Sequence, residues 1–136
     1  MYLALLRPAF SLWTSLLRRG GSHGNDAVAS LAEAGGASAL AAAGPRLIFK
    51  HSTACPFSLM AAEQVRRFAE RRPEVPVLRV LVLQERALSN AVAEATGVLH
   101  ESPQVIWMED GEVRGHLSHG EVRTDALEAW FPAEEA

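Results

Sequence analysis

The fold is decided by the stretch Arg46-Leu47-Ile48-Phe49-Lys50-His51-Ser52-Thr53-Ala54-Cys55-Pro56-Phe57-Ser58. Its first five residues place apolar side chains on both faces, which is typical of a short strand buried inside a sheet. Apolar residues then recur at helical spacing at Phe57, Ala61, Val65 and Phe68, so they predict a helix with that stripe in the core. Proline is favoured in a first helical turn. With Pro56 in that turn, we expect the helix to begin within a residue or two of Cys55.

The residues after this helix predict a second strand and a second helix. Pro73 ends the first helix, and the nearly unbroken apolar run of residues 75–83 indicates a strand at the centre of a parallel pair. Two parallel strands joined by a helix form a right-handed βαβ unit. The second helix is expected over residues 86–95, with its end at Gly97.

A hairpin and a last helix complete the expected order of elements. Asp110-Gly111 lies between the apolar runs 105–108 and 113–117, and Asp-Gly in that position is a strong hairpin signal. Thr124 is expected to cap the last helix. The order β-α-β-α-β-β-α predicts an α/β fold, in which a mixed sheet of about four strands is flanked by helices.

The N-terminal quarter of the chain is the least regular part. We expect a helix capped by Asn25 or Asp26 that runs towards Leu40, interrupted at Gly35-Gly36. Residues 1–24 are expected to lie outside the core domain, which would then span residues 25–136. The apolar part of this extension is broken by Arg7 and Pro8, so it matches neither a signal peptide nor a transmembrane span.

Length and charge limit the classes of function. The chain has 136 residues and a net charge of −3, which is typical of one soluble globular domain. Its basic residues are scattered or adjacent to acids, whereas nucleic-acid binding requires clustered positive charge. We therefore expect that the protein does not bind nucleic acid. We also expect a cytoplasmic monomer that does not bind membranes.

Cys55 is the only cysteine, so any covalent chemistry of its thiol must be intermolecular. A thiol attacks a disulfide as its thiolate, which the partial positive charge and free N–H groups of a helix N-terminus stabilise. Ser58 lies three residues further on, where its hydroxyl is expected to donate a hydrogen bond to the sulfur. Lys50 and His51 add positive potential. The alternative is that Cys55 is a packed small side chain without chemistry.

The chain resembles the thioredoxin superfamily in three features that follow one another. They are a strand, Cys-Pro-Phe-Ser at the start of a helix, and a later Ser-Pro before an antiparallel strand. Within it, four separated motifs are similar to those of the monothiol bacilliredoxins. These motifs are Phe49-Lys50-His51-Ser52-Thr53-Ala54-Cys55-Pro56-Phe57-Ser58, Arg86-Ala87-Leu88-Ser89-Asn90, His100-Glu101-Ser102-Pro103-Gln104 and Ser118-His119. The resemblance implies that Pro103 is a cis-proline beside the reactive cysteine.

The resemblance also implies an activity. Bacilliredoxins are associated with bacillithiol, a small thiol that contains glucosamine and malate, which they remove from modified client proteins. Cys55 and Ser58 would then be catalytic, and bacillithiol would be a co-substrate, with no tightly bound cofactor and no metal. The residues expected to contact the substrate are Lys50, Pro56, Arg86, Pro103 and Gln104. Lys50 and Arg86 would be partners for its carboxylates, and the alternative for each is a plain surface charge.

Other functions remain open at this point. Two chains and two small thiols could share an iron–sulfur cluster through Cys55, as in monothiol glutaredoxins. A binding module with thioredoxin fold and no catalysis is the third possibility. For His51, His100 and His119, structural hydrogen bonds are favoured over metal binding or proton transfer.

Overall fold

The computed structural model describes residues 27–132. They form a five-stranded sheet, in the order β1-β3-β2-β4-β5, with helices packed on it. Three strands are parallel: β1 (Val28–Ser30), β3 (Val77–Leu81) and β2 (Pro45–His51). β4 (Gln104–Glu109) pairs antiparallel with β2, and β5 (Glu112–Ser118) pairs antiparallel with β4. The mixed α/β sheet expected from the sequence is therefore confirmed.

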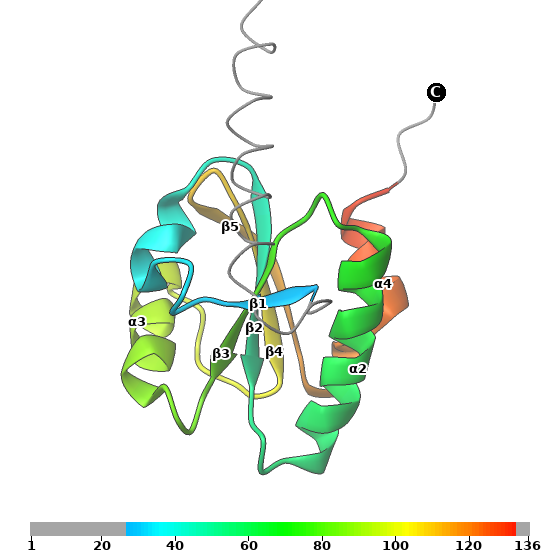
Figure 1. The fold of residues 1–136 in the computed structure, drawn as a ribbon, viewed down its shortest axis with the longest axis horizontal. Coiled ribbons are helices and arrows are strands. Elements are labelled where there is room, and N and C mark those ends of the chain that lie inside the picture. The colour runs from blue at the N-terminus through cyan, green and yellow to red at the C-terminus, as the bar shows by residue number, and fades with distance from the viewer. Residues whose placement is uncertain (1–26, 133–136) are drawn as a thin grey trace, which may run out of the picture.

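Helices cover both faces of the sheet (Figure 1). α2 (Pro56–Arg71) and α4 (Thr124–Trp130) cover one face, where β2 contributes Leu47 and Phe49 to a core with Phe68. α3 (Arg86–Thr96) and the 3-10 helix η1 (Gly36–Ala41) cover the other, where Ile48 packs in a second core. A further 3-10 turn, η2 (His119–Glu121), joins β5 to α4. Neighbouring residues of β2 thus enter different cores.

The expected β4–β5 hairpin turn and the expected end of α3 are both confirmed, and each needs residues with left-handed backbone. Asp110 and Gly111 have φ angles of 53° and 81° in the β4–β5 turn. Positive φ at both central residues is what a two-residue hairpin loop requires. Gly97 ends α3 with φ 72°, as glycine commonly does at this position.

The helix expected from residue 25 or 26 towards Leu40 is wrong. Val28–Ser30 instead form β1, which pairs with Val77–Arg79 of β3, and the chain then turns into η1. Gly35 and Gly36 have φ angles of 117° and 69°, which no right-handed helix can accommodate. Pairing with a distant strand outweighs the helix propensity of the alanines, so the sheet has five strands rather than about four.

Two local expectations are also wrong. Phe57 is 71% exposed, because the first turn of α2 extends past the sheet, whereas Ala61, Val65 and Phe68 are buried as expected. Thr124 does not cap α4, since Arg123 is the N-cap residue. The Thr124 hydroxyl instead donates to the backbone oxygen of Gln64 on α2 at 3.0 Å, and thereby joins the two helices.

The N-terminal extension, residues 1–24, and the expected domain boundary at residue 25 lie outside the described residues. Within residues 27–132, no helix has the length and apolar character needed to cross a bilayer.

Candidate thiol site

Cys55 lies at the junction between β2 and α2, as the sequence predicts. It is the N-cap residue of the 16-residue helix, and no acidic side chain stands in the first turn. Its carbonyl accepts the N–H groups of Ser58 and Leu59 at 3.1 and 3.2 Å. The cysteine is free and half-buried. The sulfur therefore stands at the positive end of a helix dipole and is still partly open to a reaction partner.

Ser58 is fully buried and makes different hydrogen bonds from those expected. Its Oγ accepts the backbone N–H of Ser52 at 2.9 Å and lies 2.7 Å from Nδ1 of His51. Within residues 27–132, no hydrogen bond joins this hydroxyl to Cys55. Ser58 thus ties the turn that carries Cys55 to the end of β2, and the expected contact with the sulfur is not made in this conformation.

His51 is a buried neighbour of the thiol site that the sequence reading underrated. Its ring stacks on Phe49, with ring centroids 5.3 Å apart. Burial lowers the pKa of His51, and the positive charge of Arg79 on β3 lowers it further. The imidazole is therefore neutral at neutral pH, and its contact with Ser58 is the structural hydrogen bond that the sequence favoured over metal binding.

Lys50 points to the opposite face of the sheet and belongs to a separate polar cluster. Its side chain is buried, and Nζ lies 3.1 Å from Nδ1 of His100. Burial lowers the pKa of Lys50. The pKa of His100 is lowered by burial and by the charges of Lys50 and Arg86, against a smaller opposing effect of Glu101. The ammonium of Lys50 is therefore closed to solvent in this conformation.

Gln104 stands directly opposite Lys50 in the β2–β4 pairing. Its Nε2 donates to the carbonyl of Leu99 and to Ser118 Oγ, while Oε1 is buried and has no partner among the described residues. The peptide bond between Ser102 and Pro103 is cis, as the resemblance implies. The carbonyl of Pro103 accepts the N–H of His119 at 2.8 Å, so this oxygen is already used.

The structure thus divides the expected site residues between two faces of the sheet. Lys50 is in one cluster with His100, beside which Arg86 is exposed at the start of α3. Ser58 is on the α2 face, and Pro56 is exposed in the first turn beside Cys55. Cys55 lies beyond the C-terminal end of β2, the central strand of the sheet.

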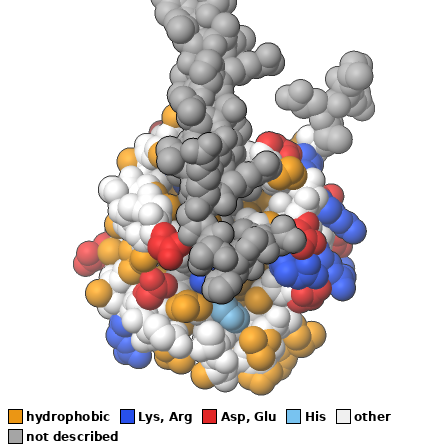
Figure 2. Space-filling model, viewed as in Figure 1, with side chains coloured by type: hydrophobic (Ala, Val, Ile, Leu, Met, Phe, Trp, Pro, Cys, Tyr) orange, Lys and Arg blue, Asp and Glu red, His pale blue; other side chains and the backbone are white. Residues whose placement is uncertain are grey.

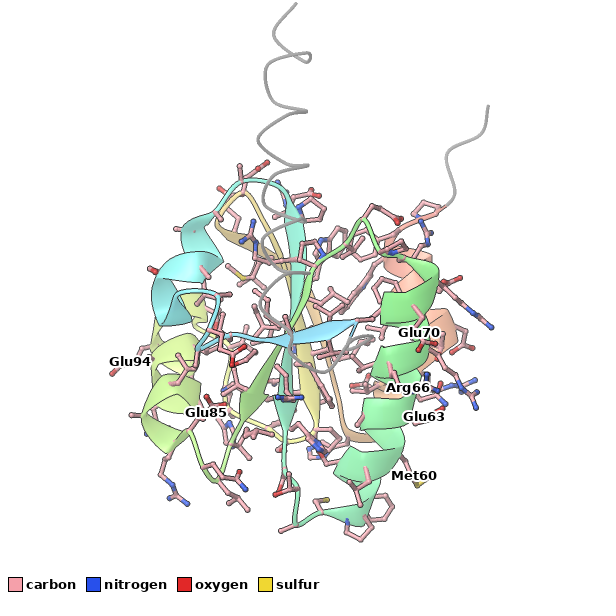
Figure 3. All side chains as sticks on the ribbon, viewed as in Figure 1. Met60, Glu63, Arg66, Glu70, Glu85 and Glu94 are labelled. Atoms are coloured by element: carbon pink, nitrogen blue, oxygen red, sulfur yellow. The ribbon has the colours of Figure 1, made fainter. Side chains whose placement is uncertain are left out.

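An exposed apolar rim near Cys55 is a feature that sequence reasoning missed. Phe57, Leu59 and Met60 are 71%, 56% and 68% exposed on the first turns of α2. Figure 3 places Met60 on the outside of that end of the helix, and Figure 2 shows apolar side chains gathered there. Phe57 and Met60 also line a groove of about 820 Å³ between α2 and the η2–α4 segment. A signal was present in the sequence, because Phe57 and Leu59 are two residues apart and cannot both lie on the buried face of one helix.

Comparison with known proteins agrees with this geometry. Residues 29–127 match the protein family described as Monothiol bacilliredoxin BrxC. A putative oxidoreductase with a thioredoxin fold is 32% identical, with a TM-score of 0.61 over 68% of this chain and 81% of that chain. Oxidized thioredoxin O2 from Arabidopsis thaliana is 20% identical, with a TM-score of 0.60 over 80% of this chain and 95% of that one. Mitochondrial thioredoxin 3 from Saccharomyces cerevisiae is 16% identical, with a TM-score of 0.57 over 74% and 87% of the two chains. With its one cysteine at the head of α2 and a thioredoxin fold around it, the chain belongs to the monothiol bacilliredoxin family.

Proposed function

We propose that this protein is a cytoplasmic thiol–disulfide oxidoreductase that removes bacillithiol from mixed disulfides on client proteins. The observation that carries the proposal is the position of Cys55, which is half-buried at the N-cap of α2. A cysteine that served only in packing would be expected inside one of the two cores, and Cys55 belongs to neither.

The first step is an exchange between two sulfur–sulfur bonds. The Cys55 thiolate attacks the bacillithiol sulfur of the mixed disulfide, and the bond between that sulfur and the client sulfur breaks. The client leaves as a thiolate, which takes a proton from solvent, and Cys55 keeps bacillithiol as a disulfide. The positive end of the α2 helix dipole stabilises the attacking anion.

The second step regenerates the cysteine. A second bacillithiol attacks as its thiolate at the bound bacillithiol sulfur, which yields bacillithiol disulfide and free Cys55 thiolate. The second bacillithiol is therefore the reductant: its sulfur is oxidised from thiol to disulfide as the client sulfur is reduced to a thiol, while the first bacillithiol stays at the disulfide level throughout. Because the chain has no second cysteine, the intermediate waits for an external thiol.

Binding of the small thiol is assigned to the polar groups around the end of β2. Arg86 is exposed and suits a carboxylate of the malate group. The buried ammonium of Lys50 would join it only after His100 moves aside. Oε1 of Gln104, which has no hydrogen-bond partner within residues 27–132, can accept one from a hydroxyl or amino group. Pro56 and Pro103 are proposed to contact the ligand near the sulfur.

The exchange can be tested with a client peptide that carries one bacillithiolated cysteine. The wild-type protein should release the free peptide thiol and gain one bacillithiol on Cys55, detected by mass spectrometry of the intact protein. The adduct should persist until bacillithiol or another thiol is added. Cys55→Ser should release no peptide, because its hydroxyl cannot replace the thiolate.

Arg66→Ala is the matched control, because Arg66 is exposed on α2 and touches none of the proposed site residues. It should act like the wild type. Release by Cys55→Ser at the wild-type rate would refute the exchange mechanism. A stoichiometric iron–sulfur cluster in anaerobically purified protein, lost in Cys55→Ser, would instead identify a cluster carrier.

A further inference from the structure

The Ser58 hydroxyl has one proton, for which two acceptors compete: Nδ1 of His51 and the sulfur of Cys55. One lone pair of its oxygen accepts the N–H of Ser52 at 2.9 Å, and His51 Nδ1 lies 2.7 Å away. A serine hydroxyl can donate only one hydrogen bond. If that proton goes to His51, it is not available to the Cys55 thiolate one helical turn away.

The surroundings of His51 favour its neutral form, in which one ring nitrogen carries a proton and the other can accept a hydrogen bond. The ring is 7% exposed, it stacks on Phe49, and burial and the Arg79 charge lower its pKa. Arg79 on β3 is the charged group that acts on it, whereas Lys50 points to the other face of the sheet. In the neutral tautomer that carries its proton on Nε2, Nδ1 is an acceptor and the short contact with Ser58 is a hydrogen bond donated by the serine.

We infer that His51 carries its proton on Nε2 and is a positioning residue, which holds the Ser58 hydroxyl proton away from Cys55 and so limits how strongly the first turn of α2 stabilises the thiolate. When Nδ1 carries the proton, it donates to Ser58 instead, and the serine proton is free to turn towards the sulfur. His51 thus controls whether Ser58 donates a hydrogen bond to the Cys55 sulfur, although His51 itself does not contact the sulfur in this proposal.

Such restraint has a chemical use in thiol–disulfide exchange. A thiolate becomes less nucleophilic as it becomes more stable, with a Brønsted coefficient of about 0.4–0.5. A site that over-stabilised Cys55 would hold more thiolate but react more slowly through it. The inference deepens the proposed function, on which it rests only in requiring that Cys55 react as a thiolate.

The test is the pH dependence of the reaction of Cys55 with the chromogenic disulfide 5,5′-dithiobis(2-nitrobenzoate). His51→Phe keeps the ring stack but removes Nδ1, so Ser58 becomes free to donate to the sulfur. A hydrogen bond to a charged group corresponds to about a tenfold effect. The pH midpoint of the rate should therefore move down by about one unit, while the rate on the high-pH plateau should fall about threefold.

The double variant His51→Phe/Ser58→Ala separates this route from a general effect. Both changes in the profile should disappear relative to Ser58→Ala alone, because the hydroxyl that carries them is gone. Ser58→Thr in the His51→Phe background should restore them. If the shifts persist without Ser58, His51 acts on Cys55 directly and the inference is wrong.

A measurement on the wild-type protein covers the case in which a variant fails to fold. Nitrogen-15 NMR of the His51 ring should show unprotonated Nδ1 when Cys55 is capped as its methyl disulfide. When Cys55 is a free thiolate, the fraction with a proton on Nδ1 should rise. An Nδ1–H form in the capped protein, or a ring that ignores the state of Cys55, would overturn the inference. Neither result bears on client release, so the exchange proposal stands or falls separately.

Discussion

Lys50→Met should make this protein more stable at neutral pH, although it removes a hydrogen bond. The Lys50 side chain is 0% exposed, and its ammonium has one hydrogen-bond partner, His100 Nδ1. Among residues 27–132 it forms no ion pair with an acid. An unpaired buried charge costs several kcal/mol, because its attraction to water is lost without replacement.

The expected gain follows from two opposing contributions. Losing the contact with His100 costs about 1 kcal/mol. Replacing buried charged groups by apolar side chains of similar volume has stabilised other proteins by about 1–4 kcal/mol. Methionine approximates the length and volume of the lysine stem. We therefore expect the free energy of unfolding at pH 7 to rise by about 1–2 kcal/mol.

The gain must depend on pH with a definite sign. Burial lowers the pKa of Lys50 in the folded state, whereas the unfolded chain keeps the ordinary value of about 10.4. Between these two values the unfolded state binds more protons, so wild-type stability rises with pH. Below the folded pKa the full penalty remains, and above about 10.4 it is gone. The advantage of Lys50→Met should therefore shrink between pH 7 and pH 10.

Urea unfolding followed by tryptophan fluorescence measures this difference, since Trp107 and Trp130 pack against the core. At a slope of about 2 kcal/mol per molar urea, the midpoint at pH 7 should rise by about 0.5–1 M with an unchanged slope. Arg86→Met is the matched control: it removes an exposed cation beside the same histidine and should change stability by less than about 0.5 kcal/mol. If Lys50→Met lowered stability at pH 7, or if its gain did not shrink as the pH rises, the prediction would be wrong. Either result would show that other groups in the fold offset the cost of burying the Lys50 ammonium.

Two further variants test the fold around the site. Leu127→Ala should lower the free energy of unfolding by about 2–5 kcal/mol, because Leu127 is 0% exposed in the core between α4 and the sheet; urea unfolding would measure the loss, and a smaller one would indicate a core that collapses around the gap. Arg66→Ala should leave the melting temperature nearly unchanged, although Arg66 contacts Glu63 and Glu70 at 2.6 and 2.7 Å, because all three side chains are exposed on α2 (Figure 3); a marked drop in a thermal melt would contradict this.

Most of the fold could be predicted because its signals are local. The strand before Cys55, the proline in the first turn of α2, Gly97 after α3 and Asp110-Gly111 in the hairpin each act within a few residues. β1 could not be predicted in this way. It is three residues long, and its stability comes from pairing with β3, which is about fifty residues away in the chain.

The reactive group of the candidate site was predictable, but its hydrogen bonds were not. A helix start near Cys55 follows from Pro56 in the first turn, so the chemistry of the thiol could be inferred. The partner of Ser58 depends on where the side chain of His51 points, and the partner of Lys50 is fifty residues away in the chain. Such contacts are set by tertiary packing, which residue types and spacing do not reveal.

The Lys50–His100 contact and the His51–Ser58 contact both depend on one property of β2. Side chains alternate between the faces of a strand, so Lys50 and His51, although adjacent, point to opposite faces. Lys50 meets His100 on the α3 side, and His51 meets Ser58 on the α2 side. A slip of one residue would exchange the two faces and place the ammonium against the first turn of α2. β2 is paired with β3 on one edge and β4 on the other, which fixes its register. The central place of this strand in the sheet therefore determines which groups surround Cys55.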